Sequence, residues 1–321
     1  MEAGEATVVL NAGSHYLLAH LPQWDVFPAV LRGRLRLKAG GITNPVAVGD
    51  VVRYAWETDS HGPARPQNDK NAMAVITEVT PRKNYVIRRS TNLSRQAHII
   101  AANVDMAYLV VSLYFPEVKL PFLDRILVTC GVYGIPATIV LSKTDMYREE
   151  APEAIDYFRS IYEGAGYRVL ETSVVTGEGI PELREACAGR VNLFSGESGV
   201  GKSSLIKALD PSLDPKIGVI SEAHLQGKHT TSLYQMYPLA TGGYVIDSPG
   251  LRGFGLVDLE KEEIGKYFPE MLRASAGCRF TPCTHTHEPG CAVKAAVDSG
   301  DISAERYNSY LGMLEEDKKF R

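Results

Sequence analysis

The sequence predicts an α/β protein built of three parts: a small N-terminal β-barrel, a central parallel α/β domain and a small helical C-terminal domain. Three observations lead to this prediction. Residues up to about 90 read as short strands with glycine-rich corners and no convincing helix. The middle of the chain contains apolar runs that each end in a polar loop, which is typical of parallel sheets. The last part combines clustered cysteines with two helical patterns.

The composition fits a protein of two or three domains that carries no membrane segment. Of the 321 residues, 45% are hydrophobic and 22% are charged. No apolar run approaches the length of a transmembrane helix. The first residues, Met1–Glu5, are acidic, whereas a secretory signal begins with basic residues and continues with an apolar core. We expect a cytoplasmic monomer that does not associate with a membrane.

Short strands are expected throughout residues 1–92. They are Ala6–Leu10, His15–His20, Val30–Leu37, Asp50–Trp56, Ala72–Val79 and Tyr85–Arg88. Five or six short strands with glycine-rich corners indicate a small barrel, of which the oligonucleotide-binding (OB) fold is a frequent example.

The barrel region carries a basic strand. Arg32, Arg34, Arg36 and Lys38 alternate in sequence, so that their side chains share one face. Residues 1–96 contain 12 Lys and Arg against 8 Asp and Glu, while the remainder contains 22 against 30. A basic module on an acidic body fits RNA binding through these four cations. The alternative is an ordinary solvated strand face, because the positive excess is modest.

The most specific motif is a complete Walker A loop late in the chain. It reads Gly196-Glu197-Ser198-Gly199-Val200-Gly201-Lys202-Ser203, followed by Ser204. An apolar strand at 191–194 precedes the loop and a helix follows it, which is the context that the motif requires. The glycines let backbone N–H groups surround a phosphate, and the helix N-terminus is positive. We expect Lys202 to reach the β- and γ-phosphates and Ser203 to ligate Mg²⁺. A chance glycine-rich turn is the alternative.

Two further segments suit the γ-phosphate and Mg²⁺. The apolar strand 243–247 ends in Asp247-Ser248-Pro249-Gly250, where Asp247 can bind Mg²⁺ and Gly250 can donate its N–H to the phosphate. Between this motif and the Walker loop lies Gly227-Lys228-His229-Thr230-Thr231, which suits a mobile switch with Thr231 closing over Mg²⁺. A solvated loop is the alternative for this second segment.

The base-reading motif is Ser142-Lys143-Thr144-Asp145, which follows the β-branched run 137–141. In GTPases the corresponding motif is Asn-Lys-x-Asp, whose Asp accepts hydrogen bonds from guanine N1–H and the exocyclic amine. The Lys stem packs against the nucleotide. Asp145 and Lys143 match this pattern and Ser142 departs from it. Because the Asn mainly ties neighbouring loops together, guanine selection should survive here and affinity should fall.

A second base-contacting loop is expected after the strand 167–170. In this Ser/Thr/Gly-rich loop, 172–179, Ser173 and Val174 would offer backbone N–H groups to the guanine carbonyl. Both base-reading segments therefore precede the Walker loop, whereas in ordinary guanine-nucleotide switches they follow it. The order predicts a circularly permuted P-loop GTPase domain over 97–257, with the same site at one edge of a parallel sheet. The switch ending at Gly250 then leads directly into the C-terminal region.

The cysteines form the second constellation. Cys130 and Cys187 sit in apolar helical patterns and are expected to be buried thiols. The other set is Cys278, Cys283, His285 and Cys291, which suits one tetrahedral structural Zn²⁺ in a C-terminal helical domain over 258–321. His287 is a competing fourth ligand. A disulfide pair with one free thiol is the rival interpretation, disfavoured by the absence of a secretory signal. Helices are expected over 292–297 and 303–320.

Together these motifs closely resemble the bacterial family of GTPases that depend on the small ribosomal subunit, RsgA/YjeQ. The similarity extends over essentially the whole chain and includes Gly49-Asp50-Val51-Val52, Pro81-Arg82-Lys83-Asn84 and Ala102-Asn103-Val104-Asp105. The resemblance implies an OB-fold barrel, a permuted GTPase domain and a zinc-knuckle domain, with GTP, Mg²⁺ and Zn²⁺ bound. It favours His285 over His287 as the fourth zinc ligand. It further implies binding to the small (30S) ribosomal subunit and its 16S rRNA, with subunit-stimulated GTP hydrolysis during late maturation.

The residue that orients the attacking water is not evident. Leu251 follows the Asp-x-x-Gly motif, where Ras-like enzymes place a glutamine, and leucine cannot orient water. Intrinsic hydrolysis should therefore be slow. We expect His229, supported by Lys202, Thr230 and Thr231, to form the catalytic group. The alternative for His229 is an RNA-contacting or ordinary loop residue. Two other functions stay open: an RNA-binding checkpoint with incidental hydrolysis, and an ATP-dependent metabolic enzyme, against which Asp145 argues.

Overall fold

The computed structural model describes residues 4–13, 15–31, 42–56, 72–89, 97–213, 234–247 and 259–315. It divides the chain into two compact units. Unit 1 contains residues 1–106, 184–195 and 203–253, and unit 2 contains 107–183, 196–202 and 254–321. The three-domain division at 92, 97 and 257 stays a prediction. Among the described residues, no helix is long and apolar enough to cross a membrane.

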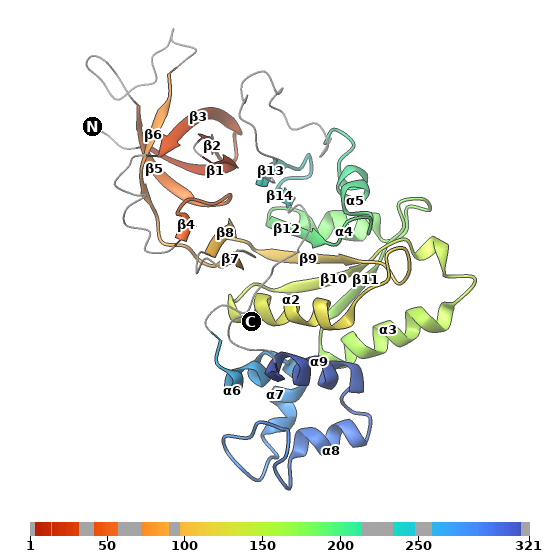
Figure 1. Ribbon diagram of the computed structural model, residues 1–321. Helices are drawn as coiled ribbons and strands as arrows, with labels where there is room; N and C mark the ends of the chain where they lie inside the picture. The colour runs from red at the N-terminus through yellow and green to blue at the C-terminus, as the bar shows by residue number, and fades with distance from the viewer. Residues whose placement is uncertain are drawn as a thin grey trace. The chain divides into compact units, whose positions relative to one another are not determined.

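Unit 1 begins with a closed five-stranded barrel (Figure 1). Its strands are β1 (Gly4–Ala12), β2 (His15–His20), β3 (Asp25–Leu31), β5 (Val51–Trp56) and β6 (Ala74–Val79). Their order is β1-β2-β3-β6-β5, and β5 returns to pair with β1. Alternate side chains fill the interior, among them Val8, Leu18, Phe27 and Ile76. The barrel expected from the short, glycine-bounded strands is present.

The third predicted strand, Val30–Leu37, begins at the wrong residue. β3 starts at Asp25, which lies opposite His20 in the hairpin with β2. Pro28 argues against a strand because it cannot donate a ladder hydrogen bond. The burial of Phe27 and Ala29 on the barrel face outweighs this local cost. The residues after Leu31, including all four predicted RNA-binding cations, lie outside the described residues.

The turns at 49–50, 82–84 and 102–104 meet at one place. Arg82 donates to both carboxylate oxygens of the buried Asp50, from Nε at 2.6 Å and from Nη2 at 2.7 Å. Gly49 has a φ of 90°, and a Cβ at this position would lie 2.1 Å from the Ala102 carbonyl oxygen. Asn84 pairs through its side-chain amide with the backbone of Val104. These contacts join the barrel to β4 (Ile42–Asn44), β7 (Tyr85–Arg89) and β8 (Ala97–Ala102), which form a small sheet of their own.

Unit 1 also contains the strand that leads to the Walker loop. This strand, β12 (Val191–Gly196), pairs in parallel with β14 (Tyr244–Asp247), and β13 (Tyr234–Pro238) pairs antiparallel with β14. β13 in turn pairs with barrel strand β1, with Leu10 opposite Gln235. The Trp24 ring stacks on the Tyr244 ring at a centroid distance of 5.7 Å. The barrel and these strands therefore form one continuous sheet.

Unit 2 is built on three parallel strands in the order β11-β10-β9. They are β9 (Met106–Val111), β10 (Ala137–Leu141) and β11 (Arg168–Glu171). Helix α2 (Leu120–Val132) follows β9, and α3 (Pro152–Ala165) follows β10. Pro152 stands in the first turn of α3, and Gly166 ends the helix with a left-handed φ of 103°, as is typical of helix termini. Helix α4 (Ile180–Cys187) and the chain entering β12 come next. Cys130 and Cys187 are buried, as predicted.

The C-terminal part of unit 2 is helical and packs beside α2 (Figure 1). Its helices are α6 (Lys261–Ile264), the 3-10 turn η3 (Gly265–Tyr267), α7 (Pro269–Ser275), α8 (Ala292–Asp298) and α9 (Ala304–Glu315). The two helices predicted at 292–297 and 303–320 correspond to α8 and α9. Their core also includes Val128 of α2, together with Phe268, Met271 and Tyr310.

Candidate nucleotide-binding site and metal centre

Ser142 ties the base-reading motif to the Walker loop. The side chain is almost completely buried at the end of β10. Its Oγ lies 2.5 Å from the Val200 carbonyl oxygen and 2.9 Å from the Val111 carbonyl oxygen. A hydroxyl has one proton, so it donates to one of these two acceptors at a time. Ser142 thus makes the inter-loop contact that the asparagine of the usual motif was expected to make.

Lys143 bridges the same two segments from the surface. Its backbone is left-handed, with a φ of 59°. The ammonium Nζ donates to the Gly199 carbonyl at 2.6 Å and to the Phe115 carbonyl at 2.7 Å. The stem of Lys143 therefore runs from the base-reading motif to the phosphate-binding loop. This is the course expected of a lysine that packs along a bound nucleotide.

Asp145 is oriented by the second base-contacting loop. Its Oδ1 accepts a hydrogen bond from Ser173 Oγ at 2.5 Å. The Ser173 hydroxyl oxygen in turn accepts from the backbone N–H groups of Val175 and Thr176. Thr144 is buried and its Oγ1 lies 3.2 Å from the Thr172 carbonyl, which joins the two loops a second time. The predicted guanine-contacting residues of both loops are thus brought together.

Tyr147, two residues after the base-reading motif, stabilises the motif through a hydrogen bond. The Tyr147 hydroxyl donates to the Ser142 carbonyl. Burial raises the pKa of Tyr147 to about 12, so this hydroxyl keeps its proton at neutral pH. Tyr147 therefore acts as a fixed donor that holds the start of the motif.

The glycines of the Walker loop are required by close contacts and by backbone conformation. A Cβ on Gly196 would lie 2.4 Å from the Val110 carbonyl oxygen. Gly199 and Gly201 have φ values of 87° and 94°, which are left-handed conformations that favour glycine. Val200 is buried, while Glu197 is partly exposed and Ser198 is exposed. The glycines therefore give the loop the left-handed conformations that let backbone N–H groups surround a phosphate.

Helix α5 (Lys202–Leu209) begins at the end of this loop. Lys202, Ser203 and Ser204 lie in its first turn, where free backbone N–H groups and the helix dipole favour an anion. In the adjoining sheet Asp247 is the last residue of β14 and lies opposite Phe194 of β12. Because β12 and β14 are parallel, Asp247 leaves the sheet at the edge where β12 enters the Walker loop.

Several predicted site residues lie outside the described residues. They are His229, Thr230, Thr231 and Gly250, together with Arg32, Arg34, Arg36, Lys38 and Leu251. Their roles in catalysis, Mg²⁺ binding and RNA binding stay predictions.

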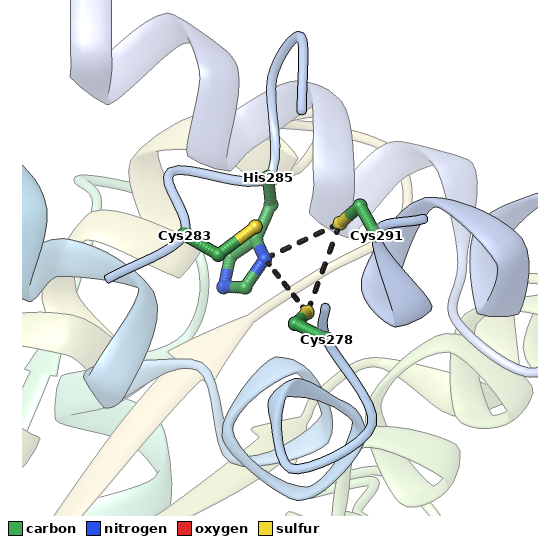
Figure 2. A group of neighbouring side chains, drawn as sticks. All are labelled: Cys278, Cys283, His285 and Cys291. Atoms are coloured by element: carbon green, nitrogen blue, oxygen red, sulfur yellow. Dashed lines mark hydrogen bonds between the residues drawn. The ribbon is translucent and has the colours of Figure 1, made fainter. Parts of the chain in front are cut away.

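The four predicted zinc ligands converge (Figure 2). One ligand atom from each of Cys278, Cys283, His285 and Cys291 lies within 4.8 Å of the others. His285 Nδ1 is 3.6 Å from Cys278 Sγ and 3.4 Å from Cys291 Sγ, and the two sulfurs are 4.0 Å apart. His287 is not a member of this group, and its Nδ1 bonds Thr286 Oγ1 at 2.9 Å.

These distances fit a tetrahedral zinc ion. With Zn–S bonds of about 2.3 Å, neighbouring sulfurs of a tetrahedron are roughly 3.8 Å apart. Burial lowers the pKa of His285, which favours the neutral imidazole that a metal needs. Two tyrosines of α9 fix the histidine segment, since Tyr307 donates to the His285 carbonyl and Tyr310 to the Thr284 carbonyl. The donor set and its support suit a closed structural site.

Sequence reasoning did not single out Phe115, which contacts the base-reading motif. Its carbonyl accepts from Lys143, and its side chain is 77% exposed. The only local signal was the following Pro116, which marks a turn after β9. The contact itself depends on a lysine 28 positions away.

Comparison with known proteins gives the family of this chain. A sequence profile of the RsgA GTPase family matches residues 79–257, which is more than half of the chain. The chain belongs to the RsgA GTPase family. An RsgA relative from Bacteroides fragilis, named small ribosomal subunit biogenesis GTPase RsgA, is 45% identical over 316 residues, covering 98% of each chain. A relative of the same name from Porphyromonas gingivalis is 42% identical over 320 residues, covering 99% of this chain and 98% of its own.

Solved structures of similar proteins agree with the RsgA fold. YjeQ from Thermotoga maritima superimposes with a TM-score of 0.74 at 31% identity, covering 98% of each chain. YloQ, described as a circularly permuted GTPase, gives a TM-score of 0.68 at 25% identity, covering 100% of this chain and 96% of that one. The predicted fold class, with its barrel and its permuted GTPase domain, is confirmed.

Proposed function

We propose that this chain is a GTPase that binds the small ribosomal subunit and assists its late maturation, with hydrolysis stimulated by the subunit and driving release. Family membership and the names of the relatives support the activity and its setting. The observation that carries the proposal is the contact of Lys143 with Gly199, next to Asp145. It joins a guanine-reading motif to a phosphate-binding loop although 56 positions separate the two residues.

The described residues divide the work of binding GTP. Asp145, oriented by Ser173, accepts hydrogen bonds from the guanine edge, and the Lys143 stem packs along the nucleoside. The backbone of 196–201 surrounds the phosphates, while Lys202 neutralises the β- and γ-phosphate charge. Mg²⁺ would be held by Ser203 and Asp247, with Thr231 joining from the switch. Bound there, the ion supplies positive charge against the phosphate oxygens.

Hydrolysis needs a group that orients water. Leu251 cannot do so, and His229 is the proposed residue, supported by Thr230 and Thr231. Intrinsic turnover is then slow, and the subunit accelerates it by fixing the switch segment. His229→Ala should bind GTP normally and lose most of the subunit-stimulated rate.

Both ends of the chain are proposed to contact the subunit. Arg32, Arg34, Arg36 and Lys38 would neutralise phosphates of the 16S rRNA, so that binding weakens with added salt. Cys278, Cys283, His285 and Cys291 would hold one structural Zn²⁺ that fixes the C-terminal loops. We propose that the protein acts in the cytoplasm as a monomer.

The decisive experiment measures GTP hydrolysis with and without purified small subunits. We expect a large stimulation by small subunits and none by large subunits, and no turnover by Lys202→Ala in either case. ATP should not compete with GTP. Equal rates with and without small subunits would rule out the proposal.

Sequence analysis leaves a second function open: a GTP-switched rRNA-binding checkpoint in which hydrolysis is incidental. Subunit release distinguishes the two. If release requires hydrolysis, the protein should stay bound with a non-hydrolysable GTP analogue. If the analogue permits release at the same rate, the checkpoint function is favoured.

A further inference from the structure

Phe115 combines an exposed aromatic ring with a restrained backbone. The side chain is 77% exposed, more than any other large hydrophobic side chain in the described part of the chain except Val175. Its φ of 53° is left-handed, a conformation that costs free energy for a residue with a Cβ. A strained, solvent-facing aromatic residue gains nothing for the fold by itself. Such features cluster at ligand-binding sites.

The segment around Phe115 is fixed by the nucleotide site. The Phe115 carbonyl accepts from Lys143 Nζ at 2.7 Å, and the same ammonium donates to Gly199 of the Walker loop. The next carbonyl, that of Pro116, accepts from Ser112 Oγ at 2.9 Å at the end of β9. Pro116 Cδ also lies within 3.6 Å of the place that a Cβ on Gly199 would take. The backbone of Phe115 is thus held against both nucleotide-binding segments.

The loop that orients Asp145 also exposes apolar side chains. Val174 is 37% exposed and Val175 is 81% exposed, directly after Ser173. Apolar groups that a folded protein leaves in water beside a binding motif mark a surface that a ligand covers. The ligand of this motif, on the proposed function, is a purine nucleotide, which has a flat π-face and an apolar sugar edge.

We propose that the Phe115 ring packs against the nucleoside of the bound guanine nucleotide and is a binding residue of this site. The inference rests on the proposed function. The ring covers the nucleoside where the Lys143 stem passes, and the Lys143 bond to the Phe115 carbonyl fixes its position. Stacking on an aromatic ring tolerates every base, so Phe115 contributes affinity, while Asp145 selects guanine.

The test is the affinity of Phe115→Ala for GTP and GDP, measured by calorimetry on the full chain. We expect both nucleotides to bind roughly tenfold more weakly or worse, by the same factor, because the nucleoside is common to both. Phe115→Leu should recover part of the loss and Phe115→Trp most of it. Phe280→Ala removes an exposed aromatic ring from the zinc loop and should leave both affinities unchanged.

A spectroscopic measurement reports the contact directly. In a background that lacks both native tryptophans, with Trp24→Phe and Trp56→Phe, the substitution Phe115→Trp places the only indole at the site, and its fluorescence should be quenched on addition of GDP. No quenching, together with unchanged affinity of Phe115→Ala, would overturn the inference. If Phe115→Ala keeps its affinity and loses stimulation by small subunits, the ring contacts the partner and the inference is also overturned. Failure of the wild-type protein to bind GTP would instead refute the proposed function.

Discussion

Arg306 of α9 donates from Nη1 to Asp124 Oδ1 of α2 at 2.6 Å, across 182 positions of the sequence. The guanidinium also pairs with Glu270 of α7, from Nε at 2.8 Å and from Nη2 at 3.2 Å. All three side chains are buried, and the Phe268 ring centroid lies 4.5 Å from the guanidinium carbon. The helix that follows β9 is therefore joined to α7 and α9 through one arginine.

Removing that arginine should be strongly destabilising. Arg306→Ala leaves two buried carboxylates without a positive partner, which costs about 3–5 kcal/mol. Urea unfolding followed by circular dichroism should show this loss. Arg159→Ala, which breaks solvent-accessible pairs with Glu163 and Glu171, should cost about 1 kcal/mol or less. Equal effects of the two substitutions would show that the buried cluster has no special weight.

The same cluster predicts a pH dependence of stability. Burial holds the pKa of the Asp124 carboxyl above its ordinary value of 3.8, although the Arg306 charge opposes this. Burial removes the carboxylate from water, so the ionised form of Asp124 is penalised. The favourable contribution of the Asp124 carboxyl to the free energy of unfolding is complete below pH 3.8. This contribution is lost as the pH rises through the raised pKa.

Asp124→Asn stays neutral and should lack this loss. Asp124→Asn should therefore become more stable relative to wild type, as measured by the free energy of unfolding, as the pH rises from 3.8 toward neutral. Urea midpoints across this range measure it. A difference that moves in favour of wild type would mean that Asp124 is a required anion. Glu270→Gln removes the negative charge and one of the two oxygens that accept from Arg306, so it is the contrasting variant and should be destabilising at neutral pH.

Ser142 offers a test of inter-loop contacts. Ser142→Ala removes the hydroxyl that donates to the Val200 or Val111 carbonyl. Losing this hydrogen bond costs about 1 kcal/mol, so GTP affinity should fall about fivefold. Ser142→Asn supplies two N–H donors and should bind GTP at least as tightly as wild type. Ser160→Ala, at an exposed position on α3, is the control. If Asn weakens binding more than Ala does, the pocket is too small for an amide and the argument fails.

Asp145 should decide which base is bound. Asp145→Asn presents one amide N–H in place of an acceptor, which faces the exocyclic amine of guanine unfavourably and the carbonyl of xanthine favourably. GTP affinity should fall about a hundredfold or more, while XTP affinity rises. Competition binding with GTP, XTP and ATP checks this. Asp156→Asn on α3 should change nothing, and an unchanged GTP preference in Asp145→Asn would remove Asp145 from the base site.

Metal removal should unfold the C-terminal loops selectively. Cys291 belongs to the core that holds α7, α8 and α9, so loss of zinc exposes that core. A strong chelator should release one zinc per chain and lower helicity. His285→Ala should reduce bound zinc, measured by mass spectrometry, whereas His287→Ala should keep it. Full zinc content in His285→Ala would assign the fourth ligand elsewhere.

Most of the elements that the sequence predicted correctly follow from local sequence patterns. The β-branched run Ala137–Leu141 became β10 without change, because a buried parallel strand needs apolar side chains on both faces. The strand, loop and helix around the Walker motif also follow from local sequence. The strand predicted at Val30–Leu37 is β3, which begins at Asp25, because the barrel accepts Pro28 for the burial of Phe27 and Ala29.

The candidate sites also combine features that local sequence predicts with contacts that depend on tertiary packing. The sequence by itself determined the identity and order of the nucleotide motifs and the three cysteines of the proposed metal centre, because each depends on residue type at fixed spacing. The choice of His285 over His287 came from the family resemblance. Only the tertiary structure decided that Ser142 reaches Val200, that Phe115 lies at Lys143, and that Arg306 joins Asp124 to Glu270. These contacts join segments between 28 and 182 positions apart. Such partners are chosen by how helices and strands pack, and short-range periodicity contains no record of that packing.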